Sequence, residues 1–523
     1  MKFNWRNPLW GLGLVLLWRV ALLVFTAQPV PANDAFFFDG AVVNWLRHGH
    51  YFNPSLSVVF PISGHQLYAA YPPLYQLALV AWMKLFGTSV ISAMALHVGL
   101  FLVSSLVAVV IVKRIFPAAV NYTPAILMLF AITFDDRPEG LAHIFGLLSL
   151  LLVGRILAEG PRRWLLAGIT LSLLAMLFTS VIVGAVYFGT GFLAVVFAWW
   201  RQRKTILFTP FVVAAVLFMA IVFAITKIEP LWWAGFQENA RQTPVLAVGF
   251  RVPDRLEIIK LIRTAPVFLL AVAALPFLFA RRKEIFSAGE PWLALFVGVF
   301  TMGWVLLVAA MTLLAPNYGG YVLFMQILLA AGLLALTANF FPERRRLLNL
   351  ALVGCVALAG VRAVGMTTWG AACAWNNSYA RTREILKAEF APFSETNSAV
   401  VVSSALLYTA LEAGVKNPVH SDWFFNRASW TNNADLNGLI ALQPRKLVLV
   451  QFDYYRAFEP LLQELRARQG LVEINVRDQA AVRTPDSIPS LQRVVQHISW
   501  APVIVDLAWK NPPAPATDSA PAR

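Results

Sequence analysis

Charged residues are scarce in this chain, and several common catalytic motifs are missing from it. Only 13% of the 523 residues are Asp, Glu, Lys or Arg, whereas 59% are hydrophobic, far from the composition of soluble domains. The two cysteines, Cys355 and Cys373, support neither a disulfide framework nor a cysteine metal site. The absence of Gly-x-Gly-x-x-Gly, Walker and Gly-x-Ser-x-Gly motifs argues against nucleotide chemistry and against a serine hydrolase.

Apolar blocks, in contrast, recur along most of the chain. They are about 20 residues long, the length that crosses a bilayer, and predict a polytopic α-helical membrane protein with about 11 transmembrane helices. Arg19 interrupts the first block and no small-x-small cleavage site follows, so this block is predicted to be an uncleaved helix. The predicted spans are residues 8–29, 88–112, 118–134, 139–158, 163–178, 181–200, 206–226, 265–280, 290–314, 320–341 and 347–367.

The net charge of +15 fits a membrane protein whose Lys and Arg residues hold loops on the cytoplasmic side. No basic helix or zinc pattern is present for reading bases, so no nucleic-acid partner is expected. Basic clusters occur at alternate junctions between spans, and placing all of them in the cytoplasm gives one consistent orientation with a cytoplasmic N-terminus. The clusters are Lys2/Arg6, Lys113/Arg114, Arg155/Arg162/Arg163, Arg201/Arg203/Lys204, Arg281/Arg282/Lys283 and Arg344/Arg345/Arg346.

The apolar segment 72–86 is short for a span and would invert the charge rule if it crossed. We therefore expect an interfacial or re-entrant helix that begins after Pro72-Pro73 and ends at Gly87, although the sequence leaves a crossing open. Outer loops then cover residues 31–87 and 227–264.

Residues beyond the last span have a different pattern. Short β-type runs at 399–402, 446–451 and 471–476 alternate with helical patterns at 405–412 and 456–469, which predicts a small α/β domain. The expected organisation is a membrane-embedded catalytic domain over 1–369, an extracytoplasmic α/β domain over 370–510 and a disordered Pro- and Ala-rich tail over 511–523.

The segment Asp135-Asp136-Arg137-Pro138-Glu139 stands between two apolar runs, and ionisable groups in such places usually mark a functional site. Glu139 and His143 are four residues apart and share a helix face. With Asp135 and Asp136 they could bind a divalent metal through oxygens and one imidazole. The alternative is an Asp–Arg pair with a helix cap, because Pro138 suits a first helical turn.

A second acidic cluster, Asp34 and Asp39, follows the first span. The run from Ala35 to Leu46 predicts an amphipathic helix that lies on the membrane surface and ends at Gly49. Such a helix would hold Asp34 at the water–lipid boundary, where a lipid head group sits. The alternative is that Asn33-Asp34 only caps this helix.

The loop 227–264 is unusually basic for an outer loop, and basic groups at a membrane boundary can hold phosphate. The alternative is a solvated helix anchored by interface aromatics. Two other arginines, Arg19 and Arg362, are expected to snorkel to the interface, and His97 is expected to make a helix–helix contact.

Taken together, the layout resembles the GT-C superfamily of membrane glycosyltransferases, which includes protein O-mannosyltransferases and aminoarabinose transferases. The resemblance rests on the acidic residue after the first span, Pro72-Pro73-Leu74-Tyr75 with Phe86-Gly87, and the acidic segment 135–139. Asn317-Tyr318-Gly319-Gly320-Tyr321 is similar to an Arg-Tyr motif without its arginine. Ala35 stands where relatives often have Glu, and Thr179-Ser180 where they often have Lys-Pro.

The resemblance implies that a sugar moves from a polyprenyl-phosphate donor to a hydroxyl of a lipid, glycan or protein acceptor at the outer face, with inversion. Asp34 would be the general base, and Asp136 and Glu139 would assist. Mg²⁺ or Mn²⁺ would be held by Asp34, Asp135, Asp136 and Glu139. Implied substrate contacts are Asp39, Tyr71, Arg137, His143, Arg241, Arg251, Arg255, Tyr318 and Tyr321.

Composition and topology suit a bacterial inner membrane. The alternatives are a transporter or lipid flippase and a non-catalytic membrane protein whose outer domain binds a partner. A transporter should carry charges near the midplane and show repeated halves, and no repeat is visible. The sugar, the acceptor and the oligomeric state are left open by the sequence.

Overall fold

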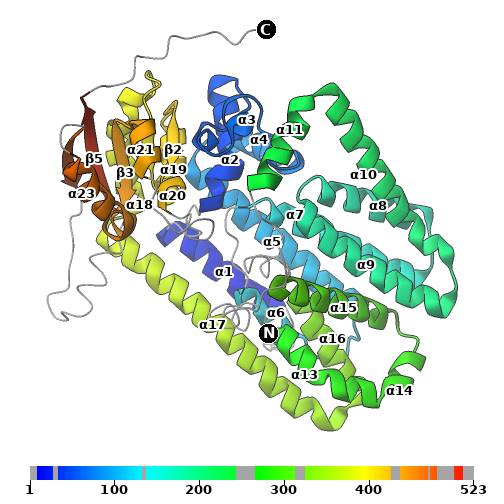
Figure 1. The fold of residues 1–523 in the computed structure, drawn as a ribbon. Helices are drawn as coiled ribbons and strands as arrows, with labels where there is room; N and C mark the ends of the chain where they lie inside the picture. Colours follow the sequence, from blue (N-terminus) through cyan, green and yellow to red (C-terminus); the bar gives the residue numbers. More distant parts are fainter. Residues whose placement is uncertain are drawn as a thin grey trace, which may run out of the picture.

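The computed structural model describes residues 9–26, 33–131, 137–242, 266–312, 324–425, 436–468, 472–479 and 500–510. A bundle of long apolar helices lies beside a smaller unit that contains a sheet, and short helices of the first loop lie between them (Figure 1). Six helical segments are long and apolar enough to cross a membrane, so the chain is an integral membrane protein. These segments are Leu9–Thr26, Val90–Ile115, Glu139–Glu159, Val181–Gln202, Thr205–Ile228 and Pro342–Trp375.

Most predicted spans correspond to helices of the bundle, although the number of crossings is not fixed by the fold. Several of these helices have fewer residues than a straight span needs. The bundle helices are α1 (Leu9–Thr26), α5 (Val90–Ile115), α7 (Glu139–Glu159), α8 (Arg163–Leu177), α9 (Val181–Gln202), α10 (Thr209–Ile228), α13 (Pro266–Ala280), α14 (Arg282–Ser287), α15 (Pro291–Thr312), α16 (Met325–Phe340) and α17 (Arg345–Asn376).

The predicted span 118–134 is not one continuous helix. Its described part has only α6 (Thr123–Leu127) and a single 3-10 turn (Met128–Ala131). The chain nevertheless returns across the bundle here, because α5 and α7 run parallel. Ser104 bonds the carbonyl of Gly140, and eleven residues later Ile115 packs on Gly154. The hydropathy pattern therefore predicted the crossing but not its broken backbone.

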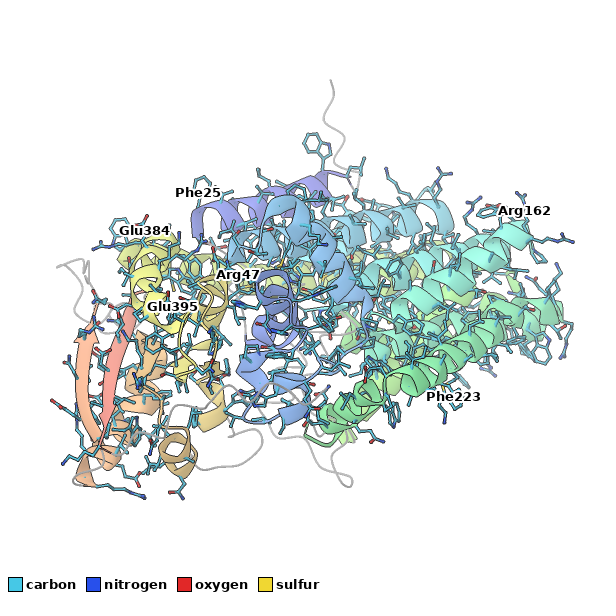
Figure 2. All side chains as sticks on the ribbon, turned by 90° about the horizontal axis from the view of Figure 1, so that it is seen from above. Phe25, Arg47, Arg162, Phe223, Glu384 and Glu395 are labelled. Atoms are coloured by element: carbon cyan, nitrogen blue, oxygen red, sulfur yellow. The ribbon has the colours of Figure 1, made fainter. Side chains whose placement is uncertain are left out.

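The basic clusters within the described residues gather at one end of the bundle, as alternate crossings require. Arg155 stacks on Trp164 across the α7–α8 turn, and Arg201 donates to the carbonyl of Ser287. Figure 2 shows Arg162 at this end, far from Arg47 and Glu384 near the sheet unit. We refer to this as the basic end and to the opposite one as the acidic end.

Short helices of the first loop cover the acidic end. Gly49 and Gly87, with φ of +76° and +87°, terminate two of them where other residues would be strained. The two predicted helices and their ends are therefore confirmed, whereas their position at the membrane surface stays a prediction. The loop contains α2 (Asn33–His48), a 3-10 turn (Pro54–Leu56), α3 (Pro61–His65) and α4 (Leu74–Phe86).

The second unit contains a five-stranded mixed sheet with strand order β2-β1-β3-β5-β4. Strand β1 pairs in parallel with β2 and β3, with Val401 opposite Val419 and Leu447, while β5 is antiparallel to β3 and β4. Two strands, β2 and β5, were absent from the sequence prediction. The elements are α18 (Tyr379–Phe390), β1 (Val400–Val402), α19 (Ser404–Glu412), β2 (Pro418–His420), α20 (Asp422–Phe425), α21 (Leu436–Leu442), β3 (Lys446–Val450), α23 (Glu459–Ala467), β4 (Val472–Asp478) and β5 (Pro502–Trp509).

The two faces of the sheet belong to different cores. Val401 and Leu447 pack under α23, whereas Val400 and Val402 face α18 and α19, as the alternation of strand side chains requires. The core on the α19 side continues into α2, α4 and the start of α5. The sheet unit is therefore packed on the first loop by a shared apolar core.

An ion-pair network ties the edge of the sheet to α18. Glu389 pairs with Arg477 and Lys446, and both bases also reach Asp506. The hydrogen bond from Arg477, helped by Lys446, lowers the pKa of Glu389 to about 2. The stabilisation by this carboxylate is therefore present above pH 4.5, its ordinary pKa, and is lost as pH falls towards 2.

We expect Glu389→Gln to lower the melting temperature of the purified protein at pH 7, and the difference from wild type to shrink as pH falls from about 5 to about 3. Intrinsic fluorescence during heating measures this. Glu384→Gln, at an exposed position on the same helix, is the control and should match wild type. A difference in melting temperature between wild type and Glu389→Gln that did not change with pH would contradict the stabilising role of the Glu389 carboxylate.

Candidate active site at the acidic end

The predicted acidic segment meets the first loop at the start of α7. Glu139 is the first residue of α7, is 6% exposed, and pairs with Arg137 Nε at 3.3 Å. The Arg137 guanidinium lies 5.9 Å from the ring centroid of Phe38 in α2, which allows a cation–π contact. The start of α7 and the helix that contains Asp34 are therefore neighbours in space.

Tyr71 joins the same cluster from the segment before α4. Its ring packs edge-on against Phe38, with centroids 4.6 Å apart. Asp34 precedes Phe38 by four residues, one turn of α2, and lies in the first turn of that helix. The backbone of Asp34, Tyr71 and the Arg137–Glu139 pair are thus brought to one place, although the side chain of Asp34 lies outside the described residues.

Asp39, on the buried side of α2, belongs to a polar network inside the first loop. Tyr75 of α4 donates to Asp39 Oδ1 at 2.9 Å, and the same hydroxyl lies 3.0 Å from Nε2 of His97 in α5. The expected helix–helix contact of His97 is therefore confirmed. Asp39 is fully buried, which favours a role in holding α2 on α4, and its predicted substrate contact stays a prediction.

The contacts of His143 are with α9 and with Phe324, and not with Glu139. Its Nδ1 bonds the hydroxyl of Tyr187 in α9 at 2.9 Å, and its ring lies 5.0 Å from that of Phe324. Gly146 makes room for this pair, because a Cβ there would stand 2.4 Å from the Tyr187 ring. His143 thus lies one turn after Glu139 in α7 and is held by its hydrogen bond to Tyr187, whereas Glu139 is held by Arg137.

Arg19 was expected to snorkel, and this prediction is wrong. The side chain is only 4% exposed and lies between Trp18 and Phe101, at 4.6 and 4.9 Å from their ring centroids. Phe101 in turn lies 6.4 Å from Phe324, the ring that contacts His143. Arg19 is therefore a buried cation beside the site; the one charge in an apolar run was its only signal in the sequence.

The second outer loop is bonded to the first. Helix α11 (Pro230–Gln242) places Glu238 against the start of α3, where its carboxylate accepts from the backbone of Ile62 and Ser63 at 3.2 and 3.3 Å. Asn239 donates to the carbonyl of Ala70 at 2.7 Å. No local pattern around Glu238 indicates this contact. Its role depends on residues 176 positions away.

The remaining predicted site residues cannot be placed in this cluster. Arg241 lies in α11 but its side chain is outside the described residues, as is that of Arg362 in α17; six others lie outside the described ranges altogether. Those six are Asp135, Asp136, Arg251, Arg255, Tyr318 and Tyr321.

A metal centre is not formed by the part of the chain that the structure describes, where no group of three potential ligands converges. Glu139 faces the Arg137 guanidinium, and His143 is bonded through Nδ1 to Tyr187. These residues do not fit a metal by themselves, and the other predicted ligands lie outside the described side chains.

No known protein family and no curated protein matches the sequence. Among solved structures, the chain is similar to apo ArnT from Cupriavidus metallidurans, with 14% identity, a TM-score of 0.48, and coverage of 94% of this chain and 97% of that one. It is also similar to the Archaeoglobus fulgidus oligosaccharyltransferase complex with Zn and sulfate, with 10% identity, a TM-score of 0.45, and coverage of 86% and 69%. At these scores, function has to be inferred from the chain's own residues.

Burial raises the pKa of Asp39 to about 8, although the hydrogen bond from Tyr75 opposes the shift. Asp39 therefore contributes most to folding when protonated, and this contribution is lost as pH rises from about 4 to about 8. We expect Asp39→Asn, which stays neutral, to gain stability relative to wild type over this pH range, measured by thermal unfolding.

Tyr75→Phe is the companion variant. It removes the hydroxyl that bonds to both Asp39 and His97, and should destabilise the protein by about 1–3 kcal/mol. An Asp39→Asn variant whose stability followed wild type at every pH would show that this carboxyl titrates normally.

Proposed function

We propose that the chain is a membrane glycosyltransferase that moves a sugar from a polyprenyl-phosphate donor to an acceptor hydroxyl at the acidic end of the bundle. The observation that supports this most directly is the contact between Arg137 and Phe38. It joins the start of α7, with Glu139, to the helix that contains Asp34. Two acidic clusters about 100 residues apart in the sequence thus share one side of the bundle, as transfer at a single membrane face requires.

In the proposed reaction, Asp34 accepts the proton of the acceptor hydroxyl. The oxygen of that hydroxyl attacks the anomeric carbon of the donor from the side opposite the phosphate. The bond between the anomeric carbon and the phosphate oxygen breaks, so the configuration inverts and polyprenyl phosphate leaves. A carboxylate within hydrogen-bond reach of the hydroxyl contributes roughly 10²–10⁴-fold in rate. Asp136 and Glu139 orient the acceptor, and Arg137 holds Glu139 in place.

The departing phosphate needs cations, and Arg19 supports this part of the proposal. It is buried about seven residues before the end of α1, roughly 10 Å from the acidic end. Its guanidinium lies against Phe101, and Phe101 is near Phe324. Phe324 in turn contacts His143, one turn after Glu139 in α7. A buried guanidinium stabilises a developing phosphate charge more strongly than an exposed one. Arg241, Arg251 and Arg255 are proposed to supply further positive charge from the second loop.

A divalent metal, if bound, would need ligands from residues outside the described side chains. No step above depends on it; a metal held by Asp34, Asp135 and Asp136 would add positive charge to the site. A bacterial inner membrane with a cytoplasmic basic end fits the charge distribution. A transporter or flippase should place several charges near the midplane. Arg19 is a buried charge near the middle of α1, whereas Arg137 and Glu139 stand at the very start of α7.

Asp34→Asn tests the general base. The turnover of a polyprenyl-phosphate sugar should fall by about 10²–10⁴-fold with little change in melting temperature, because the amide cannot accept the proton. Product formation by mass spectrometry measures this in protein purified from membranes. Glu384→Gln, which neutralises an exposed acid far from the site, is the control and should turn over like wild type. Wild-type turnover in Asp34→Asn would show that Asp34 is not the general base.

Arg19→Lys and Arg19→Met test the phosphate contact. If the cation serves the donor, the methionine variant should raise the donor KM or lower kcat by about tenfold or more, and lysine should recover part of the loss. A purely structural arginine would instead lower the melting temperature in both variants, with the activity per folded molecule unchanged.

A further inference from the structure

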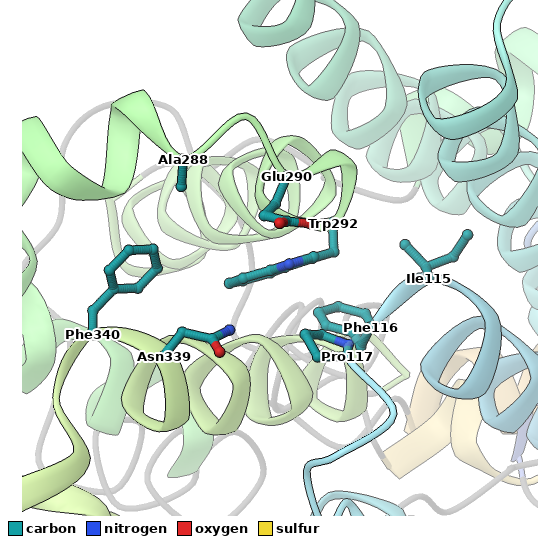
Figure 3. Close-up of a pocket in the computed structure, with 8 residues that line it drawn as sticks. All are labelled: Ile115, Phe116, Pro117, Ala288, Glu290, Trp292, Asn339 and Phe340. Carbon is teal, nitrogen blue, oxygen red and sulfur yellow. The ribbon is translucent and has the colours of Figure 1, made fainter.

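A cavity of about 330 Å³ opens at the basic end of the bundle, far from the acidic site. Its position follows from α5, which contains His97 near one end and Ile115 at the other, roughly 27 Å apart along the helix. The cavity lies between the end of α5, the start of α15 and the end of α16 (Figure 3). Its lining residues are Ile115, Phe116, Pro117, Ala288, Glu290, Trp292, Asn339 and Phe340.

Aromatic rings and one carboxylate surround this space. Trp292 crosses it between Glu290 on one side and Asn339 on the other, and Phe116 packs near its indole with centroids 6.0 Å apart (Figure 3). Phe340 closes a further side. Aromatic faces together with an acidic group are the combination that recognises an ammonium cation.

One buried polar group of the cavity lacks the contact expected of it. Trp292 is 2% exposed, yet its indole N–H has no hydrogen-bond acceptor among the described residues. A buried donor of this kind normally has a partner, so a ligand acceptor would satisfy it. Glu290 lines the cavity from an exposed position and forms no ion pair within the described part of the chain, so its carboxylate is accessible to a cationic ligand.

Positive charge lies around the mouth of the cavity. Lys113 and Arg114 occupy the last turn of α5 directly before Ile115, and Arg201 donates to the carbonyl of Ser287 next to Ala288. The cavity therefore has one carboxylate in its lining and several positive groups nearby. This matches a zwitterion whose ammonium and phosphate are a few bonds apart.

We propose that this cavity binds the head group of a phospholipid that has a primary ammonium, that is, of the phosphatidylethanolamine class. Glu290 and the rings of Trp292, Phe116 and Phe340 take the ammonium. The Trp292 N–H donates to a head-group oxygen, and the surrounding bases attract the phosphate. A lipid is favoured over a soluble amine because the cavity lies where apolar helices end, at the depth of lipid head groups.

Native mass spectrometry of the purified full chain tests this proposal. The protein is incubated with equal amounts of phosphatidylethanolamine and phosphatidylglycerol, and the retained lipid is counted. We expect the wild type to retain phosphatidylethanolamine preferentially, and Glu290→Gln to lower its retention by about fivefold or more, as loss of a charge-assisted hydrogen bond predicts. Trp292→Phe, which keeps a ring and removes the N–H, should lower it by a smaller factor.

Glu343→Gln is the matched control, because Glu343 is an exposed acid at the same end that does not line the cavity. It should retain lipid like wild type. Equal retention of the two lipids, or unchanged retention in Glu290→Gln, would overturn the proposal. A third arm adds soluble phosphoethanolamine. Displacement of the lipid at equal concentration would assign the cavity to a soluble amine and overturn the lipid assignment. These outcomes are independent of glycosyl transfer.

Discussion

The packing of α2 between two partners is the constraint on which the candidate site depends. On one side, Asp39 is bonded to Tyr75 and thereby to His97 of a bundle helix. On the other side, α19 of the sheet unit packs on α2 in a shared apolar core. Because α2 is fixed from both sides, the turn that contains Asp34 is set in one position relative to α7. The proposed role of Asp34 as general base requires preorganisation of this kind.

Local patterns in the sequence were sufficient for much of the fold. The apolar blocks predicted the long helices, and Gly49 and Gly87 predicted the ends of α2 and α4, because both signals are contained in a few neighbouring residues. The segment 118–134 was predicted wrongly as a helix because hydropathy reports the need for burial, not the continuity of backbone hydrogen bonds. Strands β2 and β5 were missed for a related reason: each is specified by partners on β1, β3 and β4, distant in the sequence.

The candidate site was predictable as a pair of acidic clusters, but not as an arrangement. The contact between Phe38 and Arg137 and the bond between His143 and Tyr187 join residues that no periodicity connects. Arg19 shows the limit most clearly. A single arginine in an apolar run is compatible with snorkelling and with burial, and only its packing between Trp18 and Phe101 decides between them.

The broken segment between α5 and α7 has a consequence for how the protein enters the membrane. Among the described residues between α5 and α7, only the five of α6 and the four of the following 3-10 turn are helical, so the backbone groups around them need protein neighbours for their hydrogen bonds. Lipid cannot supply such partners, and this stretch cannot partition on its own during synthesis. Neighbouring helices such as α5 and α7 therefore have to enclose this stretch before its backbone hydrogen bonds can be satisfied within a membrane.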